Sequence, residues 1–79
     1  MMYLYLVERT DQIYYEQYDS FVCVAENAGQ ALGMLPDPDL STDYWTNDQA
    51  NLKCTWLGEA APEYRKPAII LTSASSRRN

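Results

Sequence analysis

The sequence predicts a small α+β domain with the order ββαββ, a mostly antiparallel four-stranded sheet with one short helix on one face. Four segments have the alternating, β-branched and aromatic composition of strands, and one segment between them has apolar residues at helical spacing. The chain has 79 residues, which leaves room for one core. A single short helix closes such a core by lying across one face of the sheet.

The first two strands are expected at residues 3–9 and 20–26. In YLYLVER (3–9), leucines alternate with two tyrosines and a valine, so the two sets lie on opposite faces. In SFVCVAE (20–26), Phe21 and Cys23 lie opposite the two valines for the same reason. Residues 10–19 are too many for a tight hairpin, so we expect them to form a long connection.

A short helix of about two turns is expected after the second strand. Asn27 precedes apolar residues at helical spacing and has Gln30 three positions later, a pattern typical of a helix cap. Gly29 and Gly33 each weaken this helix by roughly 1 kcal/mol relative to alanine. Pro36 ends it, because a residue before proline avoids helical angles. Tertiary packing must therefore hold the helix in place.

The last two strands are expected at residues 52–59 and 67–73. Apolar residues alternate along the first of them, and the apolar run at 69–71 predicts burial of the second on both faces. A glycine, a proline and three charged residues between the two strands indicate a hairpin loop. The acidic, proline-containing segment 36–51 is expected to be irregular.

The domain is expected to span residues 1–74, followed by a flexible basic tail at 75–79. With the helix on one face of the sheet, we expect the opposite face to stay half-exposed and to carry Tyr3, Tyr5 and Val7. An aromatic patch of this kind suits a partner protein or a second copy of the chain, so a homodimer is one expectation.

The net charge of −5 is unevenly distributed. Residues 1–52 have a balance of −8, and residues 53–79 have a balance of +3. An acidic surface repels nucleic acid and membranes and attracts basic partners, so we expect no direct duplex binding and no membrane binding. The sequence has no apolar run near the ~20 residues of a membrane span and no secretory signal, which favours a cytoplasmic protein.

The sequence predicts no enzyme, no cofactor and no metal site. It contains no histidine, the usual general base and metal ligand, and its three glycines do not have the spacing of a phosphate loop. Cys23 and Cys54 lack the C-x-x-C spacing of a zinc or redox site. Reduced, buried thiols are the expected state, and a disulfide between neighbouring strands is the alternative.

Aromatic residues interleaved with acids form the candidate binding site. Tyr and Trp are enriched at the centres of protein interfaces, and surrounding carboxylates would steer a basic partner. The alternative is that these rings cover the edge of a small core. The candidate partner-binding residues are Asp11, Tyr14, Tyr15, Glu16, Tyr18, Asp19, Asp43, Tyr44, Trp45 and Asp48.

Five segments resemble a family of very short accessory proteins of tailed bacteriophages and prophages. These segments are LYLVERTD (4–11), YDSFV (18–22), AE (25–26), LGEA (57–60) and IILTSA (69–74). The resemblance spans most of the chain and concerns strands and their boundaries, so it carries no catalytic residue across. The chain departs from the family pattern at 36–39 and 76–79. Small phage proteins of this kind often neutralise a host enzyme or defence complex, anti-CRISPR proteins being one such class.

The leading hypothesis is therefore a phage-encoded acidic protein that inhibits a bacterial host or defence complex. It would act in the host cytoplasm, binding a protein or a ribonucleoprotein and occupying a basic groove in place of nucleic acid. Two alternatives remain open. One is an oligomeric sponge for a signalling nucleotide, with Arg9, Arg65 and Lys66 on the phosphates. The other is a self-assembling structural or host-takeover protein.

Overall fold

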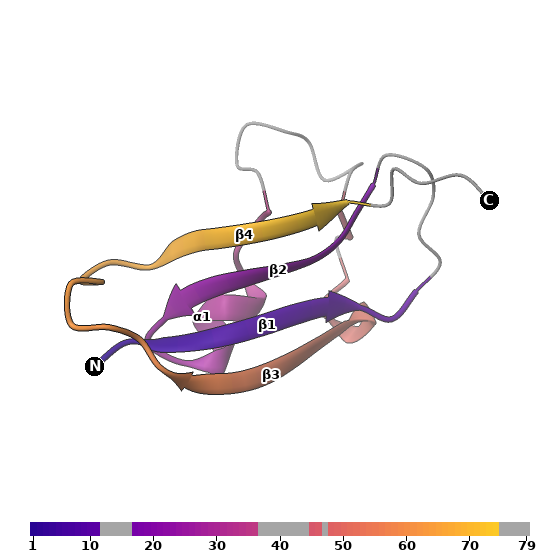
Figure 1. Ribbon diagram of the computed structural model, residues 1–79. Helices are drawn as coiled ribbons and strands as arrows, with labels where there is room; N and C mark the ends of the chain where they lie inside the picture. Colours follow the sequence, from indigo (N-terminus) through magenta and orange to yellow (C-terminus); the bar gives the residue numbers. More distant parts are fainter. Residues whose placement is uncertain (12–16, 37–44, 47, 75–79) are drawn as a thin grey trace.

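The computed structural model describes residues 1–11, 17–36, 45–46 and 48–74. Within these ranges the predicted α+β class and its ββαββ order are confirmed (Figure 1). The predicted tail lies outside the described residues. The elements are β1 (Tyr3–Arg9), β2 (Tyr18–Ala25), α1 (Ala28–Leu32), the 3₁₀ turn η2 (Gln49–Asn51), β3 (Leu52–Glu59) and β4 (Ala68–Ala74).

The four strands form one antiparallel sheet in the order β3-β1-β2-β4. The first two strands are central and the last two lie at opposite edges, so the predicted hairpin between β3 and β4 is wrong. The connection at residues 60–67 instead crosses one end of the sheet from edge to edge (Figure 1). It must span three strand spacings of ~4.8 Å, which is within reach of a segment extending ~3.3 Å per residue.

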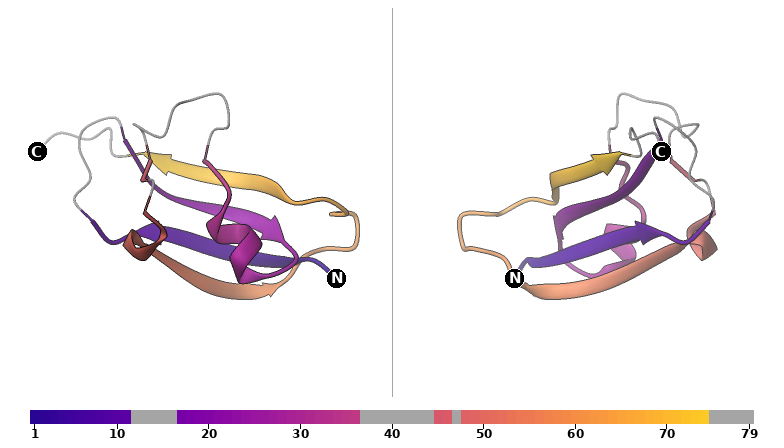
Figure 2. Two further views of the ribbon diagram at one scale, coloured as in Figure 1. Left: turned by 180° about the vertical axis from the view of Figure 1, so that it is seen from behind. Right: turned by 45° about the vertical axis from the view of Figure 1, so that its right-hand side comes forward.

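Helix α1 lies on one face of the sheet, behind the strands in Figure 1 and in front of them in the left view of Figure 2. The predicted cap is confirmed: the backbone N–H of Gln30 donates to Asn27 Oδ1 at 2.8 Å. Gln30 Oε1 accepts in turn from the backbone N–H of Glu26 at 2.7 Å. The helix has five residues and ends at Gly33, so it is shorter than expected. Its two glycines favour this early end.

The core lies between the sheet and α1, on what we call the helix side. It comprises Tyr5, Val7, Phe21, Cys23, Ala25, Ala31 and Trp45. The prediction that Tyr3, Tyr5 and Val7 face away from the helix is wrong, because Tyr5 and Val7 are in this cluster and Tyr3 packs against it. Alternation shows which residues of β1 share a face. Both faces are apolar, so the sequence does not show which of them the helix covers.

The apolar run of β4 is also placed differently from the prediction. Ile70 is 42% exposed and Leu71 is 65% exposed, so burial on both faces is wrong. The cause is the strand order, since β4 has a neighbour on one side only. Ile69, by contrast, packs against the helix-side core.

The two cysteines lie on strands separated by β1. Cys23 is on β2, Cys54 is on β3, and both are free thiols. Two strand spacings of ~4.8 Å exceed the ~4.4–6.8 Å between the Cα atoms of a disulfide, so the pairing of neighbouring strands considered from the sequence does not apply. Cys23 is buried and Cys54 is half-buried. Burial, together with the nearby Cys54 thiol, raises the pKa of Cys23 to about 11, so that it is protonated at neutral pH.

Candidate functional site

The face of the sheet turned away from α1, which we call the helix-free face, faces the viewer in Figure 1. Strand register assigns its residues in rows that run across the sheet. Leu4, Val24 and Ala68 form one row. A second, adjacent row comprises Leu6, Val22 and Leu71, with Thr55 beside Leu6 on β3. A third row is polar and comprises Lys53, Glu8, Ser20 and Ser73. The face therefore has an apolar centre and a polar border along one end.

Large exposed apolar side chains concentrate on the two edge strands. On β4 they are Ile70 and Leu71, and on β3 they are Trp56 and Leu57, at 58% and 49% exposure. Trp56 also contacts Tyr3, with ring centroids 6.3 Å apart. Leu71 belongs to the helix-free face, because it pairs with Val22. Trp56 pairs with Tyr5 and so belongs to the helix side. Among the described residues, the helix-free face therefore joins its apolar rows to the exposed Leu71 on β4.

Arg9, the last residue of β1, makes a set of hydrogen bonds at the end of the strand. Its Nε and Nη2 atoms donate to the two carboxylate oxygens of Asp11, each at 2.8 Å. Its Nη1 donates to Gln17 Oε1 at 3.3 Å and to the backbone carbonyl of Tyr18 at 3.2 Å. The side chain is only 4% exposed. A buried guanidinium needs such a set of acceptors, because an unpaired buried charge is costly. Arg9 therefore ties the end of β1 to the start of β2.

Trp45 completes this cluster from the core side. Its ring lies 5.3 Å from that of Phe21, centroid to centroid, and the Arg9 guanidinium carbon lies 5.9 Å from its centroid. Trp45 is 5% exposed. The expectation that Trp45 stands at the surface as a binding anchor is therefore wrong; the structure gives it the core role that the sequence left as the alternative. An indole beneath a partly desolvated guanidinium is a favourable arrangement.

Among the described residues, the carboxylates of Asp11 and Asp48 accept hydrogen bonds within the fold. The Arg9 hydrogen bonds lower the pKa of Asp11, which keeps it ionised at neutral pH. Asp48 Oδ1 caps η2 by accepting from the backbone N–H of Ala50 at 2.9 Å, although its side chain remains exposed.

The remaining predicted residues are partly described. Asp19 accepts from Ser20 Oγ at 3.0 Å, and Tyr18 is half-buried against the core. Arg9 brings Asp11, Tyr18 and Trp45 together, but as a structural cluster. The other predicted residues lie outside the described residues: Tyr14, Tyr15, Glu16, Asp43 and Tyr44.

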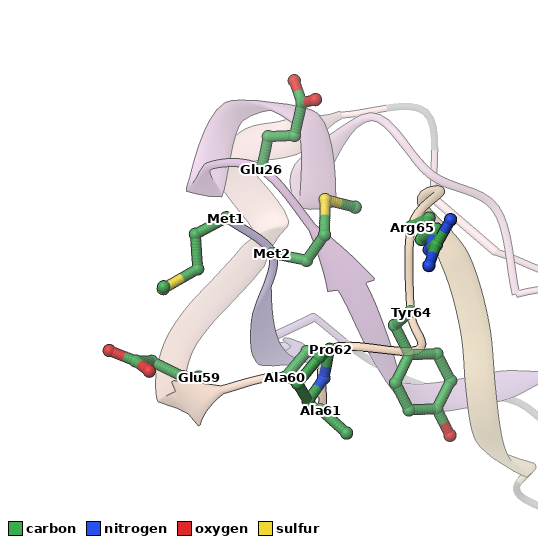
Figure 3. Close-up of a pocket in the computed structure, with 9 residues that line it drawn as sticks. All are labelled: Met1, Met2, Glu26, Glu59, Ala60, Ala61, Pro62, Tyr64 and Arg65. Carbon is green, nitrogen blue, oxygen red and sulfur yellow. The ribbon is translucent and has the colours of Figure 1, made fainter.

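A hollow of about 590 Å³ lies where residues 60–65 pass the start of β1 (Figure 3). Met1, Met2 and Tyr64 give it apolar walls, and its charged lining residues are Glu26, Glu59 and Arg65. Two carboxylates beside one guanidinium do not favour phosphate. Arg9 lies at the other end of β1, so the cations considered for a nucleotide sponge do not converge here.

The described residues show no arrangement suited to metal chemistry. In residues 1–11, 17–36, 45–46 and 48–74, no group of three or more histidine, cysteine, aspartate or glutamate side chains could hold an ion. With five residues, α1 is also far shorter than the ~20 residues a membrane span requires, and no other helix in the described ranges reaches that length.

Comparison with known proteins found no relative: no family model matches, and neither a curated protein nor a solved structure is detectably similar to this chain. The resemblance to phage accessory proteins stays a prediction. The function of this chain is therefore inferred from its geometry. Sequence reasoning chose aromatic and acidic residues and missed the helix-free face, although the leucines of β1 and the valines of β2 already alternated with the residues now in the core.

Proposed function

We propose that this chain is a non-catalytic protein-binding protein whose contact surface is the helix-free face of the sheet. The observation that supports it is the pair of apolar rows across three strands, which are partly exposed except at Val24 and end in the exposed Leu71. Antiparallel sheets covered on one side usually turn polar residues outward. Here apolar residues occupy the centre of the uncovered face as well.

The size of the face suits a protein partner. Four strands at ~4.8 Å and seven residues at ~3.3 Å give a flat area on the order of 400 Å² before side-chain relief. A standard interface buries about 800 Å² per partner, so the face and its edge residues could supply much of a moderate interface. Apolar burial contributes about 25 cal/mol per Å², less the costs of association.

The partner that we propose is a bacterial host or defence complex with an apolar patch beside basic residues, inhibited by occupation of that patch. The net charge of −5 supports a basic partner, since opposite charge accelerates encounter. Glu8 borders the apolar rows, although Lys53 lies beside it in the register. The phage resemblance supports a bacterial source for the partner. Nucleic-acid mimicry is the more specific form of the same proposal.

Capture from a bacterial lysate tests the contact surface. We expect Leu6→Lys and Thr55→Lys to reduce capture of the main partner at least tenfold, because each buries a charge in the contact. Ala28→Lys, at an exposed position of α1, is the matched control and should capture normally. Thermal unfolding of each variant shows that the fold is kept. Capture that is equal for both face variants and the wild type would contradict the proposal.

The charge of the partner is tested by salt. Capture through apolar contact assisted by opposite charge should weaken, without vanishing, as ionic strength rises and the Debye length shrinks. Capture that does not change with salt would contradict the proposal of a basic partner, but it would agree with an apolar contact.

A further inference from the structure

The two edge strands of the sheet differ in how they are protected. Edge strands present unpaired N–H and C=O groups, and proteins commonly guard them with charged side chains. β3 carries Lys53 and Glu59, whereas β4, with the sequence AIILTSA, carries no charged residue. β4 is also rich in good strand formers and is mostly exposed. Within the described part of the chain, the outer edge of β4 is therefore open to pairing with another strand.

The register of β4 with β2 shows which part of the exposed β4 edge is regular enough to pair with another strand. The shift between Val22 and Cys23 leaves Ile70 without a partner on β2, and such a bulge locally disturbs an edge. Beyond it, Leu71, Thr72 and Ser73 pair with successive residues of β2. The stretch that follows Ile70 is thus regular, uncharged and exposed.

We propose that β4 pairs antiparallel with β4 of a second copy of this chain, joining two four-stranded sheets into one of eight strands. A two-fold axis perpendicular to the sheet produces this pairing. Because the axis preserves the faces, both helices lie on one side and both helix-free faces on the other. The row of Leu6, Val22 and Leu71 then continues into the second copy, and Leu71 loses much of its exposure to water.

The uncharged sequence of β4 suits pairing with a second copy of the same strand. Arg65 and Lys66 directly precede β4. Parallel pairing would place these cations of both copies side by side. Antiparallel pairing of seven-residue strands separates them by about 23 Å, well beyond the Debye length of ~8 Å at physiological salt. The strand itself brings no charge to the interface, so no like charges lie opposite each other along Ala68–Ala74.

The guarded β3 edge limits the assembly to two copies. Pairing of β4 with β3 would repeat head to tail and generate a filament, whereas pairing of β4 with itself closes after one step. Lys53 and Glu59 on β3 disfavour the first arrangement. The inference is independent of the proposed function, because the dimer forms at an edge and leaves the β1 and β2 residues of both helix-free faces open, although Leu71 belongs to both surfaces.

Sedimentation of the purified chain over a wide concentration range tests the pairing. We expect a monomer–dimer equilibrium in the wild type. Leu71→Lys should weaken the dimer at least tenfold, because it places two cations across the two-fold axis. Because Leu71 is 65% exposed, we expect the variant to keep its fold, and circular dichroism checks this. Leu57→Lys, at 49% exposure on β3, is the matched control and should dimerise as the wild type does.

Amide hydrogen exchange separates edge pairing from other dimers. Protection of the β4 amides should rise with protein concentration, while that of the β3 amides stays constant. A wild type that remains monomeric at millimolar concentration would overturn the inference. A second result would also overturn it: Leu6→Lys abolishes the dimer, and the β4 amides exchange at the same rate at all concentrations. That combination would indicate a dimer formed by stacking of the helix-free faces.

Discussion

Both faces of the sheet carry apolar side chains, but the two faces are used differently. On the helix side, Phe21 and Val7 are fully buried beneath α1 and Trp45. On the helix-free face, Val24 is fully buried at the centre, while Leu71 at the edge is 65% exposed. In a chain of 79 residues one helix covers one face, so the partly exposed apolar residues of the other face, such as Leu6 and Leu71, are available for association. Substitutions on the two faces should therefore have very different costs.

The largest effect is expected at the centre of the helix side. Phe21→Ala should lower the free energy of unfolding by about 3–5 kcal/mol, because it removes a buried ring and its contact with Trp45. Urea denaturation followed by circular dichroism measures the loss. Phe21→Leu, which fills most of the space, is the control and should cost much less. A small loss for Phe21→Ala would mean that the helix side is not the main core.

A smaller effect is expected at the end of the helix side, where Arg9 joins β1 to β2. Arg9→Met keeps the apolar stem and removes the hydrogen bonds to Asp11 and Tyr18. A hydrogen bond to a charged group contributes about 1.5–3 kcal/mol net of its exchange with water, and Asp11 is partly exposed, so we expect a loss on the order of 2 kcal/mol. Urea denaturation measures it, and tryptophan fluorescence should report a changed environment at Trp45. Lys53→Met, at an exposed site, is the control, and an equal loss there would contradict the prediction.

The Asp11 carboxylate predicts how this region responds to acid. Its pKa is lowered by the Arg9 hydrogen bonds, so its contribution to stability is fully present above its ordinary value of 3.8. That contribution is lost as the pH falls through the lower pKa of the folded protein. Because Asp11 is partly exposed, the effect should be below ~1 kcal/mol. Acid unfolding of Asp11→Asn, compared with the wild type, should show a shallower dependence on pH in this range; identical curves would argue against the pairing in solution.

The smallest effect is expected at the edge of the helix-free face. In dilute solution, Leu71→Ser should change the free energy of unfolding by no more than ~0.5 kcal/mol, as is usual for exposed positions. Thermal unfolding at micromolar concentration measures it. A loss comparable to that of Phe21→Ala would show that the helix-free face is covered within one chain, and the contrast between the two faces would then fail.

Local sequence patterns were sufficient to predict the strands and the helix of this fold. Alternation in YLYLVER and SFVCVAE predicted β1 and β2 within two residues, and the Asn27 and Gln30 pair predicted the start of α1. Each of these signals depends on residues a few positions apart, and backbone geometry converts them directly into structure. The candidate site was harder to predict, because exposure depends on residues far away in the chain.

By itself, the sequence determined the strands, the helix cap and which residues share a face. Only the tertiary structure decided that Tyr5 and Val7 lie beneath α1, that β3 and β4 lie at opposite edges, and that Trp45 packs with Arg9 in the interior. The physical reason is that alternation shows which residues share a face of the sheet, but not which of the two faces is covered. Choosing between two apolar faces, or between two strand orders, depends on long-range packing that short patterns do not contain.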